Sequence, residues 1–475
     1  MTASSAAERP GSELDRFLRL FSDVRVGEGG TALILTANVF LLLCAYYVIK
    51  PVREALILTG GGAEVKSYAA AGQAILLLAL VPVYGLLADR LPRRRLLNAV
   101  TAFFVVCLIG FWSLARAGAA VGVPFFLWVG IFNLMIVAQF WSFANDLYSK
   151  DQGERLFPIV AFGASLGAVG GSALTSKLIP LLGVPELLLV AASLLIAAAA
   201  LSQLADARER ARNEATLPAR LTTAEIPAAT GEYQILATAE GPKVTVSTAG
   251  GAAGGRKGTF QLVFSDRYLL LIALLMLVLN WVNTTGEYIL SRTVAAAAAD
   301  AVARGTAGGL GVAEFIGEFY SGFYLVVNLL GLVLQLFVVS RLIKYAGVPI
   351  AVLALPLIAA GGYTLLAFAP ILAAVRWVKT AENATDYSVQ NTVRNVLFLP
   401  TSRDQKYKAK QAIDSFFVRA GDVLSAILIY VGTSQLAFGP AQFARVNLVL
   451  SLVWIGLAVA VGRAYVRKTS PGAAA

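Results

Sequence analysis

Hydrophobic residues gather along this chain in runs of about 20, separated by short polar segments. A run of that length can cross the roughly 30 Å hydrocarbon core of a bilayer as an α-helix. The pattern predicts an all-α membrane protein with twelve transmembrane helices in two six-helix halves. The predicted helices cover 31–49, 67–88, 96–116, 123–147, 156–181, 185–205, 267–290, 314–344, 348–369, 371–399, 411–437 and 442–466.

Composition supports this prediction and narrows the chemistry. The chain is 58% hydrophobic and 14% charged, whereas soluble domains have about 25% charged residues. It contains no histidine, and its two cysteines, Cys44 and Cys107, lie in separate apolar runs. Catalytic triads, imidazole metal sites and a disulfide framework are therefore not expected. We predict no enzyme activity, no cofactor and no metal site.

The lysines and arginines indicate the orientation in the membrane. Most of the 39 fall in segments that share one side if both termini lie there, and the positive-inside rule makes that side cytoplasmic. The net charge of +11 thus reflects topology, and we expect no nucleic-acid partner but a multi-pass protein of the inner membrane. The predicted organisation is a cytoplasmic segment 1–30 with a possible interfacial helix at 14–21, a half 31–205, a flexible linker 206–266, a half 267–466 and a cytoplasmic tail 467–475.

One loop carries a recognisable signature. Gly85 is followed by Asp89-Arg90 and then by three arginines at 93–95. This segment resembles the loop signature of the major facilitator superfamily, although a plain basic anchoring loop is the alternative. The resemblance implies two parallel halves with a substrate site between them, and a gating role for Asp89 and Arg90.

Two further patterns fit two packed halves. Ser149-Lys150-Asp151-Gln152 is echoed by Ser402-Arg403-Asp404-Gln405, after the fourth and the tenth predicted helix. Gly163, Gly167 and Gly171 recur every four residues on the fifth helix, and such a small-residue face lets two helices approach closely. We interpret these glycines as packing residues.

Charged residues inside the predicted spans are the strongest functional signal. Each costs about 2.5–3.5 kcal/mol at the bilayer centre, so several together indicate a polar cavity, internal ion pairs or snorkelling to the interface. Cations on the first and tenth helices favour a small anionic substrate. The candidate substrate-binding residues are Tyr46, Lys50, Arg53, Asn145, Glu287, Lys379, Asn383 and Asp386, and the candidate coupling or gating residues are Glu54, Asp89, Arg90, Asp146 and Glu382.

The segment from Pro400 through a lysine-rich loop to Ala412-Ile413-Asp414 resembles the ATP/ADP translocase (nucleotide transporter) family. The run Phe140–Asn145 is also similar to that family, as is the basic-x-x-basic-acidic order of Lys50, Arg53 and Glu54. The resemblance implies exchange of ATP/ADP-type nucleotides or a related phosphorylated anion by alternating access. Lys50, Arg53 and Lys379 would bind phosphate, while Glu287 and Asp386 would balance charge or contact the ribose or base.

The chain also departs from that family. Pro51 and Val52 replace the middle of its first-helix motif, and Arg419-Ala420-Gly421-Asp422 replaces a glycine-rich segment. Two other functions therefore stay open: a proton-coupled carrier of another organic anion or solute, and a non-transporting membrane scaffold or receptor. We expect a monomer embedded in the lipid bilayer.

Overall fold

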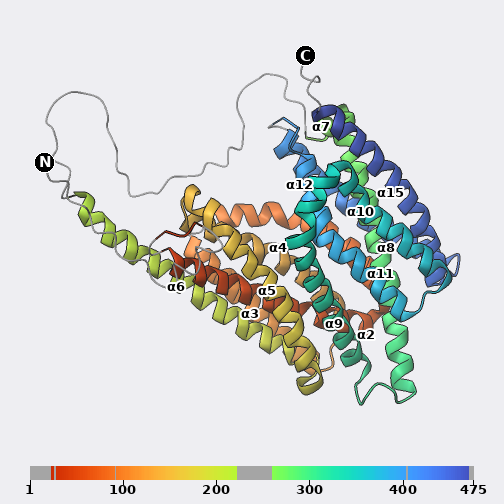
Figure 1. Ribbon diagram of the computed structural model, residues 1–475. Helices are drawn as coiled ribbons and strands as arrows, with labels where there is room; N and C mark the ends of the chain where they lie inside the picture. The colour runs from red at the N-terminus through yellow and green to blue at the C-terminus, as the bar shows by residue number, and fades with distance from the viewer. Residues whose placement is uncertain (1–22, 26–27, 91–92, 222–258, 403–404, 470–475) are drawn as a thin grey trace.

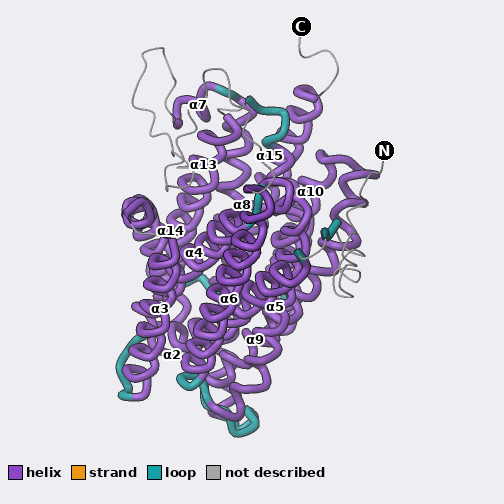
Figure 2. The backbone as a smooth tube through the Cα atoms, turned by 90° about the vertical axis from the view of Figure 1, so that its left-hand side faces the viewer, coloured by secondary structure: helices purple, strands orange, loops and turns teal. Residues whose placement is uncertain are grey.

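The computed structural model describes residues 23–25, 28–90, 93–221, 259–402 and 405–469. Within these ranges the backbone forms helices joined by short loops, without a β-strand (Figures 1 and 2). The predicted interfacial helix at 14–21, most of the predicted linker and the residues Arg403 and Asp404 lie outside the described part.

The helices form two groups, seen in Figure 1 as warm colours at the left and green to blue at the right. The N-terminal helix group comprises α2 (Gly29–Arg90), α3 (Arg93–Arg116), α4 (Gly122–Leu147), α5 (Lys150–Leu182) and α6 (Leu187–Leu221). The C-terminal helix group, which follows the short α7 (Thr259–Ser265), is built from α8 (Arg267–Ala303), α9 (Val312–Val333), η1 (Leu334–Val338), α10 (Val339–Phe368), α11 (Leu372–Thr385), η2 (Asp386–Gln390), α12 (Asn391–Leu397), η3 (Gln405–Ala409), α13 (Lys410–Ala412), η4 (Ile413–Phe417), α14 (Val418–Ser434) and α15 (Pro440–Thr469).

In the described part of the chain, eight helical segments are long and apolar enough to cross a membrane. Two of them, Gly29–Leu77 and Val312–Phe368, each contain residues from two predicted helices. The helix axis is broken within α2 at Gly62 (φ 78°) and within α10 at Gly347 (φ 78°). Glycine adopts this positive-φ conformation without steric cost, so each position can serve as the turn between two antiparallel helices.

Several helices are longer than the hydrophobic pattern predicted. Residues 50–66, predicted to be mostly loop, are helical apart from Gly62. The seventh predicted helix continues from residue 290 to Ala303, because the alanine-rich stretch 295–299 favours helix. The sixth continues from 205 to Leu221. The tenth and eleventh predicted helices are each divided by π-helical turns, η2 and η4.

The glycine face of α5 packs tightly against α2, as the sequence predicted. A Cβ atom on Gly163, Gly167 or Gly171 would collide with the backbone carbonyl oxygen of Thr36, Phe40 or Cys44, respectively. The two sets of residues share a four-residue spacing, so the helix backbones lie in direct contact over two turns.

Contacts between the two helix groups are concentrated away from the chain termini. We call the side where α2 begins and α15 ends the terminal side, and the opposite side the far side. Toward the far side, Lys66 Nζ donates to Ser291 Oγ at 2.7 Å, Tyr288 Oη donates to Glu64 Oε1 at 2.7 Å, and the hydroxyls of Ser176 and Ser321 lie 2.8 Å apart. Among the described residues, the side-chain hydrogen bonds between the groups lie at the middle of the bundle or on the far side, so the far side is closed.

Candidate functional site

Among the cavities between the helix groups in the described part of the chain, two adjoin each other at Lys50. The larger has a volume of about 490 Å³ and is lined by α2, α4, α8, η2, α12 and α14; the smaller has a volume of about 210 Å³ and lies nearer the far side. Lys50, Asn283 and Tyr387 line both cavities. These volumes fall in or near the range of small-molecule sites.

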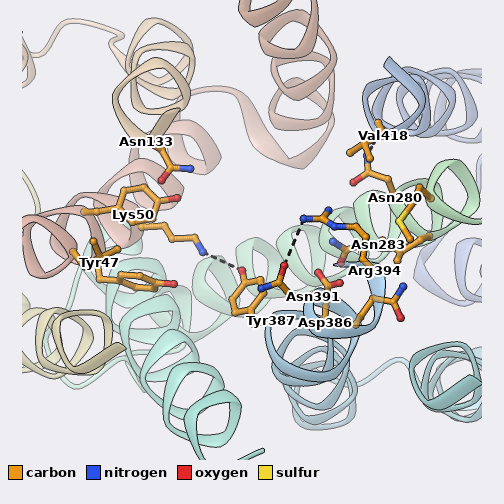
Figure 3. A pocket seen from close by; sticks show the side chains of 15 residues that line it. Tyr47, Lys50, Asn133, Asn280, Asn283, Asp386, Tyr387, Asn391, Arg394 and Val418 are labelled. Atoms are coloured by element: carbon orange, nitrogen blue, oxygen red, sulfur yellow. Dashed lines mark hydrogen bonds between the residues drawn. The ribbon is translucent and has the colours of Figure 1, made fainter. Parts of the chain in front are cut away.

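Lys50 projects into the larger cavity from α2 (Figure 3). Its ammonium lies 3.9 Å from the centre of the Tyr324 ring and donates to Tyr387 Oη at 3.4 Å. The ring of Tyr47 lies 5.3 Å away. Among the described residues no carboxylate oxygen lies within 4.0 Å of Lys50 Nζ, although the residue is only 8% exposed. Aromatic faces attract a cation but do not neutralise it, so the Lys50 ammonium is open to pairing with an anion of a bound solute.

Arg53 and Lys66 share one carboxylate. Glu54, which is fully buried, forms ion pairs with the Arg53 guanidinium and with Lys66 Nζ, the latter at 2.6 Å. Arg53 and Lys66 line the smaller cavity, whereas Glu54 lies behind them. Two cations paired with one anion leave this cluster one positive charge in excess.

Lys379 belongs to a second cluster, in which two carboxylates share one cation and leave one negative charge in excess. Its ammonium lies 3.0 Å from Glu382 Oε2, 3.5 Å from Glu287 Oε1 and 2.8 Å from Asn283 Oδ1. Lys379 and Glu382 are buried and line neither cavity, whereas Glu287 lines the smaller one. The structure therefore places Lys379 behind the cavity wall, where it neutralises carboxylates of its own helix group.

The C-terminal helix group contributes the opposite wall of the larger cavity. The π-turn η2 and the start of α12 present Asp386, Tyr387, Asn391 and Arg394 on one face. Figure 3 shows Arg394 and Asp386 on the side of the cavity away from Lys50. Among the described residues, the carboxylate nearest to Arg394 is that of Asp414, 3.9 Å from Nε. π-turns are often found at functional sites, and here one directs two neighbouring side chains to the cavity.

The other predicted site residues are placed as follows. Tyr46 lines the larger cavity and Asn383, which donates to Glu287 Oε1 at 3.0 Å, lines the smaller. Asn145 and Asp146 are exposed at the end of α4 and line neither cavity. The side chains of Asp89 and Arg90 lie outside the described part of the structure.

Sequence reasoning missed several cavity residues. Lys66 falls just before the predicted helix 67–88, because the apolar run of that helix begins after it. Arg394 and Tyr387 lie on the polar stripe of the tenth predicted helix, and that stripe was a signal for both. Tyr324 sits in an aromatic segment whose spacing gives no sign of a partner cation.

Comparison with known proteins shows the fold. No protein-family model and no curated protein matches this sequence. Among solved structures, the peptide transporter POT in complex with sulfate is 14% identical, with a TM-score of 0.59, over 94% of this chain and 99% of that chain. A bacterial homologue of the human lysosomal transporter Spinster, inward-facing and unoccupied, is 15% identical (TM-score 0.55; 93% and 98% covered). The nucleoside transporter NupG is 13% identical (TM-score 0.53; 92% and 98% covered).

These likenesses extend over nearly the whole chain, at an identity too low to indicate a shared substrate. The protein is a multi-pass membrane protein with a major facilitator-like fold. The resemblance to ATP/ADP translocases stays a prediction.

Proposed function

We propose that this protein is a membrane transporter that exchanges an ATP/ADP-type nucleotide, or a related phosphorylated anion, across the inner membrane by alternating access. The orientation follows from the positive-inside pattern, which makes the terminal side cytoplasmic. In this orientation the described conformation, closed on the far side, is ready to receive a solute from the cytoplasm.

The observation that carries the proposal is the environment of Lys50. This lysine lies at the junction of the two cavities with tyrosine faces around it, and no carboxylate of the described residues lies within 4.0 Å of its ammonium. A buried cation without a counter-ion is costly, and an anionic solute would supply the missing charge. Arg394 from the opposite helix group, loosely paired with Asp414, would provide a second contact.

In this mechanism Lys379 has a different role from the one suggested by the family resemblance. It would hold Glu287 and Glu382 in place, and Lys50, Arg53 and Arg394 would meet the phosphate groups. Arginine offers bidentate hydrogen bonds to phosphate, while lysine acts as a point charge. Tyr46 and Tyr387 would supply a surface for the rest of the solute.

The test is uptake into liposomes that contain the purified protein. We expect labelled ATP to enter liposomes preloaded with ADP and not empty ones. Lys50→Ala should reduce the rate at least tenfold, whereas Lys177→Ala should leave it unchanged, because Lys177 is exposed on α5 outside both cavities. Equal uptake by Lys50→Ala and wild type would contradict the proposal.

A second candidate, a proton-coupled carrier, is favoured by one observation. Glu287 faces the smaller cavity with 25% of its side chain exposed and shares Lys379 with Glu382. Two carboxylates beside one ammonium form a group in which one carboxylate can take up a proton. Under this function an imposed pH gradient, rather than internal ADP, would drive uptake, and Glu287→Gln would abolish that dependence.

A further inference from the structure

The carboxylate of Asp386 differs from the other carboxylates of the central region. It lines the larger cavity, yet within the described part of the chain it accepts no hydrogen bond and has no cation within 4.0 Å. Figure 3 shows it beside Asn391, on the same side of the cavity as Arg394.

Asp422, in the smaller cavity, provides the contrast. Its Oδ1 accepts hydrogen bonds from Asn280 and Thr284 at 2.7 Å each, and its Oδ2 lies 3.3 Å from Arg419. Asp422 thus has the partners that a carboxylate within a membrane requires. Asp386 has no such partner among the described residues, although a carboxylate can accept hydrogen bonds from two or three donors.

In the described structure, the nearby amide groups do not donate to Asp386. The Asn280 amide nitrogen donates to Val418 O and to Asp422. Asn283 Oδ1 accepts from Lys379, and Asn391 Oδ1 lies 3.5 Å from Arg394. The Gln390 amide, on the same wall, does not donate to Asp386 in the described structure either. A solute in the cavity can therefore supply hydrogen-bond donors to this carboxylate.

The charges of the larger cavity limit what such a donor can be. Its charged lining residues are Lys50, Arg394 and Asp386, and Arg394 lies 3.9 Å from the Asp414 carboxylate. A solute whose anionic group lies toward Lys50 and whose uncharged donors lie toward Asp386 complements this lining. Two adjacent hydroxyl groups match the two oxygens of one carboxylate, as in the contact between an acidic residue and a ribose in dinucleotide-binding folds.

We propose that Asp386 is the specificity-determining residue of the larger cavity, where it accepts hydrogen bonds from a ribose-like vicinal diol of the anionic solute. The anionic group of the same solute lies toward Lys50. The inference rests on the proposed function and deepens it, because it separates sugar phosphates and ribonucleotides from simple anions and from deoxyribonucleotides.

The experiment measures binding to the purified full-length protein by calorimetry with five probes: ADP, 2′-deoxy-ADP, adenosine, 2′-deoxyadenosine and inorganic phosphate. We expect wild type to bind ADP at least about tenfold more tightly than 2′-deoxy-ADP, because a site built to bind a hydroxyl strongly rejects the analogue that lacks it. Asp386→Asn should bring this ratio close to one without weakening phosphate binding. Asp300→Asn, a control at an exposed position paired with Arg304, should keep the ratio.

The outcomes separate the two proposals. Equal affinity of wild type for the ribose and deoxyribose forms would overturn the role of Asp386, whatever the affinity for phosphate. An equal loss of affinity for all probes in Asp386→Asn would also overturn it, because that result indicates a structural role. If wild type bound no phosphorylated probe but distinguished adenosine from 2′-deoxyadenosine, the anion transport function would fail and the diol site would stand. Absence of binding to all five probes would overturn both.

Discussion

Gln152 and Gln405 make the same pair of interactions in the two helix groups. Gln152 Oε1 accepts from the backbone N–H of Ser149 at 3.0 Å, and Gln405 Oε1 accepts from that of Ser402 at 3.1 Å. Each Nε2 then donates to the acidic residue that precedes the first helix of its group: Gln152 to Glu28 at 3.2 Å, and Gln405 to Asp266 at 2.9 Å. The sequence echo thus corresponds to a repeated structural joint between equivalent helices.

A basic residue completes each joint. Arg155 pairs with Glu28 at 2.9 Å, and Lys468 pairs with Asp266 at 3.1 Å. Burial raises the pKa of the Glu28 carboxyl, but hydrogen bonds from Arg155, the Arg25 backbone and Gln152 outweigh burial and bring the pKa down to about 2. The ion pair at Glu28 should therefore persist in mildly acidic conditions.

The first prediction concerns the pH dependence of this joint. A folded-state pKa of about 2, below the ordinary 4.5, means that Glu28 stabilises the folded state fully above about pH 4.5 and loses this effect as pH falls toward 2. At pH 7 we expect Glu28→Gln to lower the free energy of unfolding by roughly 1–2 kcal/mol, which corresponds to a few degrees in the apparent melting temperature. Melting curves of both proteins in detergent at several pH values should converge toward pH 3. A constant difference over that range would contradict the ion-pair explanation.

The second prediction tests the contact between α5 and α2. A Cβ atom on Gly167 would collide with the backbone of Phe40, which cannot move without shifting α2. Overpacking of this kind typically costs about 1–3 kcal/mol. Gly167→Ala should therefore lower the melting temperature and the yield of folded protein. Gly110→Ala is the control, because nothing lies within 4 Å of its added Cβ, and it should match wild type. Equal stability of the two variants would contradict the close packing.

The sequence predicted the helices well and the ion-pair partners poorly. Hydrophobic runs located the helical segments because burial in a bilayer requires about 20 apolar residues. The four-residue spacing of Gly163, Gly167 and Gly171 predicted close packing because that spacing keeps one face of the helix in register. Neither the apolar runs nor the glycine spacing indicates which helix packs against which.

Partner identity depends on how helices far apart in the sequence pack together. Lys50 and Lys379 look alike in sequence, as single lysines on polar helix faces. Lys50 faces tyrosines, whereas Lys379 meets Glu287 from α8 and Glu382 from its own helix. The i, i+3 spacing of Lys379 and Glu382 is visible in the sequence and indicates that Glu382 can neutralise the lysine. The position of Glu287 relative to them could not be deduced.

The third prediction follows from the Lys379 cluster. Removing this lysine leaves Glu287 and Glu382 without their cation, and breaking a buried ion pair from one side costs about 3–5 kcal/mol. We expect Lys379→Met to lower both the melting temperature and transport. Adding Glu382→Gln should restore part of the stability, because it removes one of the two carboxylates. The same double substitution would give no recovery if Lys379 acted only on the substrate. Thermal melting of wild type, Lys379→Met, Glu382→Gln and the double variant distinguishes these results.

The last prediction concerns closure of the far side. Lys66 Nζ donates to Ser291 Oγ at 2.7 Å, and this bond joins α2 of one helix group to α8 of the other. A hydrogen bond to a charged group contributes about 1.5–3 kcal/mol, so its loss should raise the population of conformations open on the far side at least severalfold. We therefore expect Ser291→Ala to speed the reaction of a cysteine at position 67, beside the smaller cavity, with a membrane-impermeant thiol reagent added to the far side.

This measurement needs a protein in which Cys44 and Cys107 are replaced by alanine, so that only the introduced cysteine reacts. Ser193→Ala is the matched control, because the Ser193 hydroxyl bonds only to Leu189 of its own helix in the described structure and is exposed. Faster labelling in Ser291→Ala but not in Ser193→Ala would show that the bond between Lys66 and Ser291 helps to close the far side. An unchanged rate would mean that the other contacts on this side, such as that of Tyr288 with Glu64, hold the groups together without Lys66.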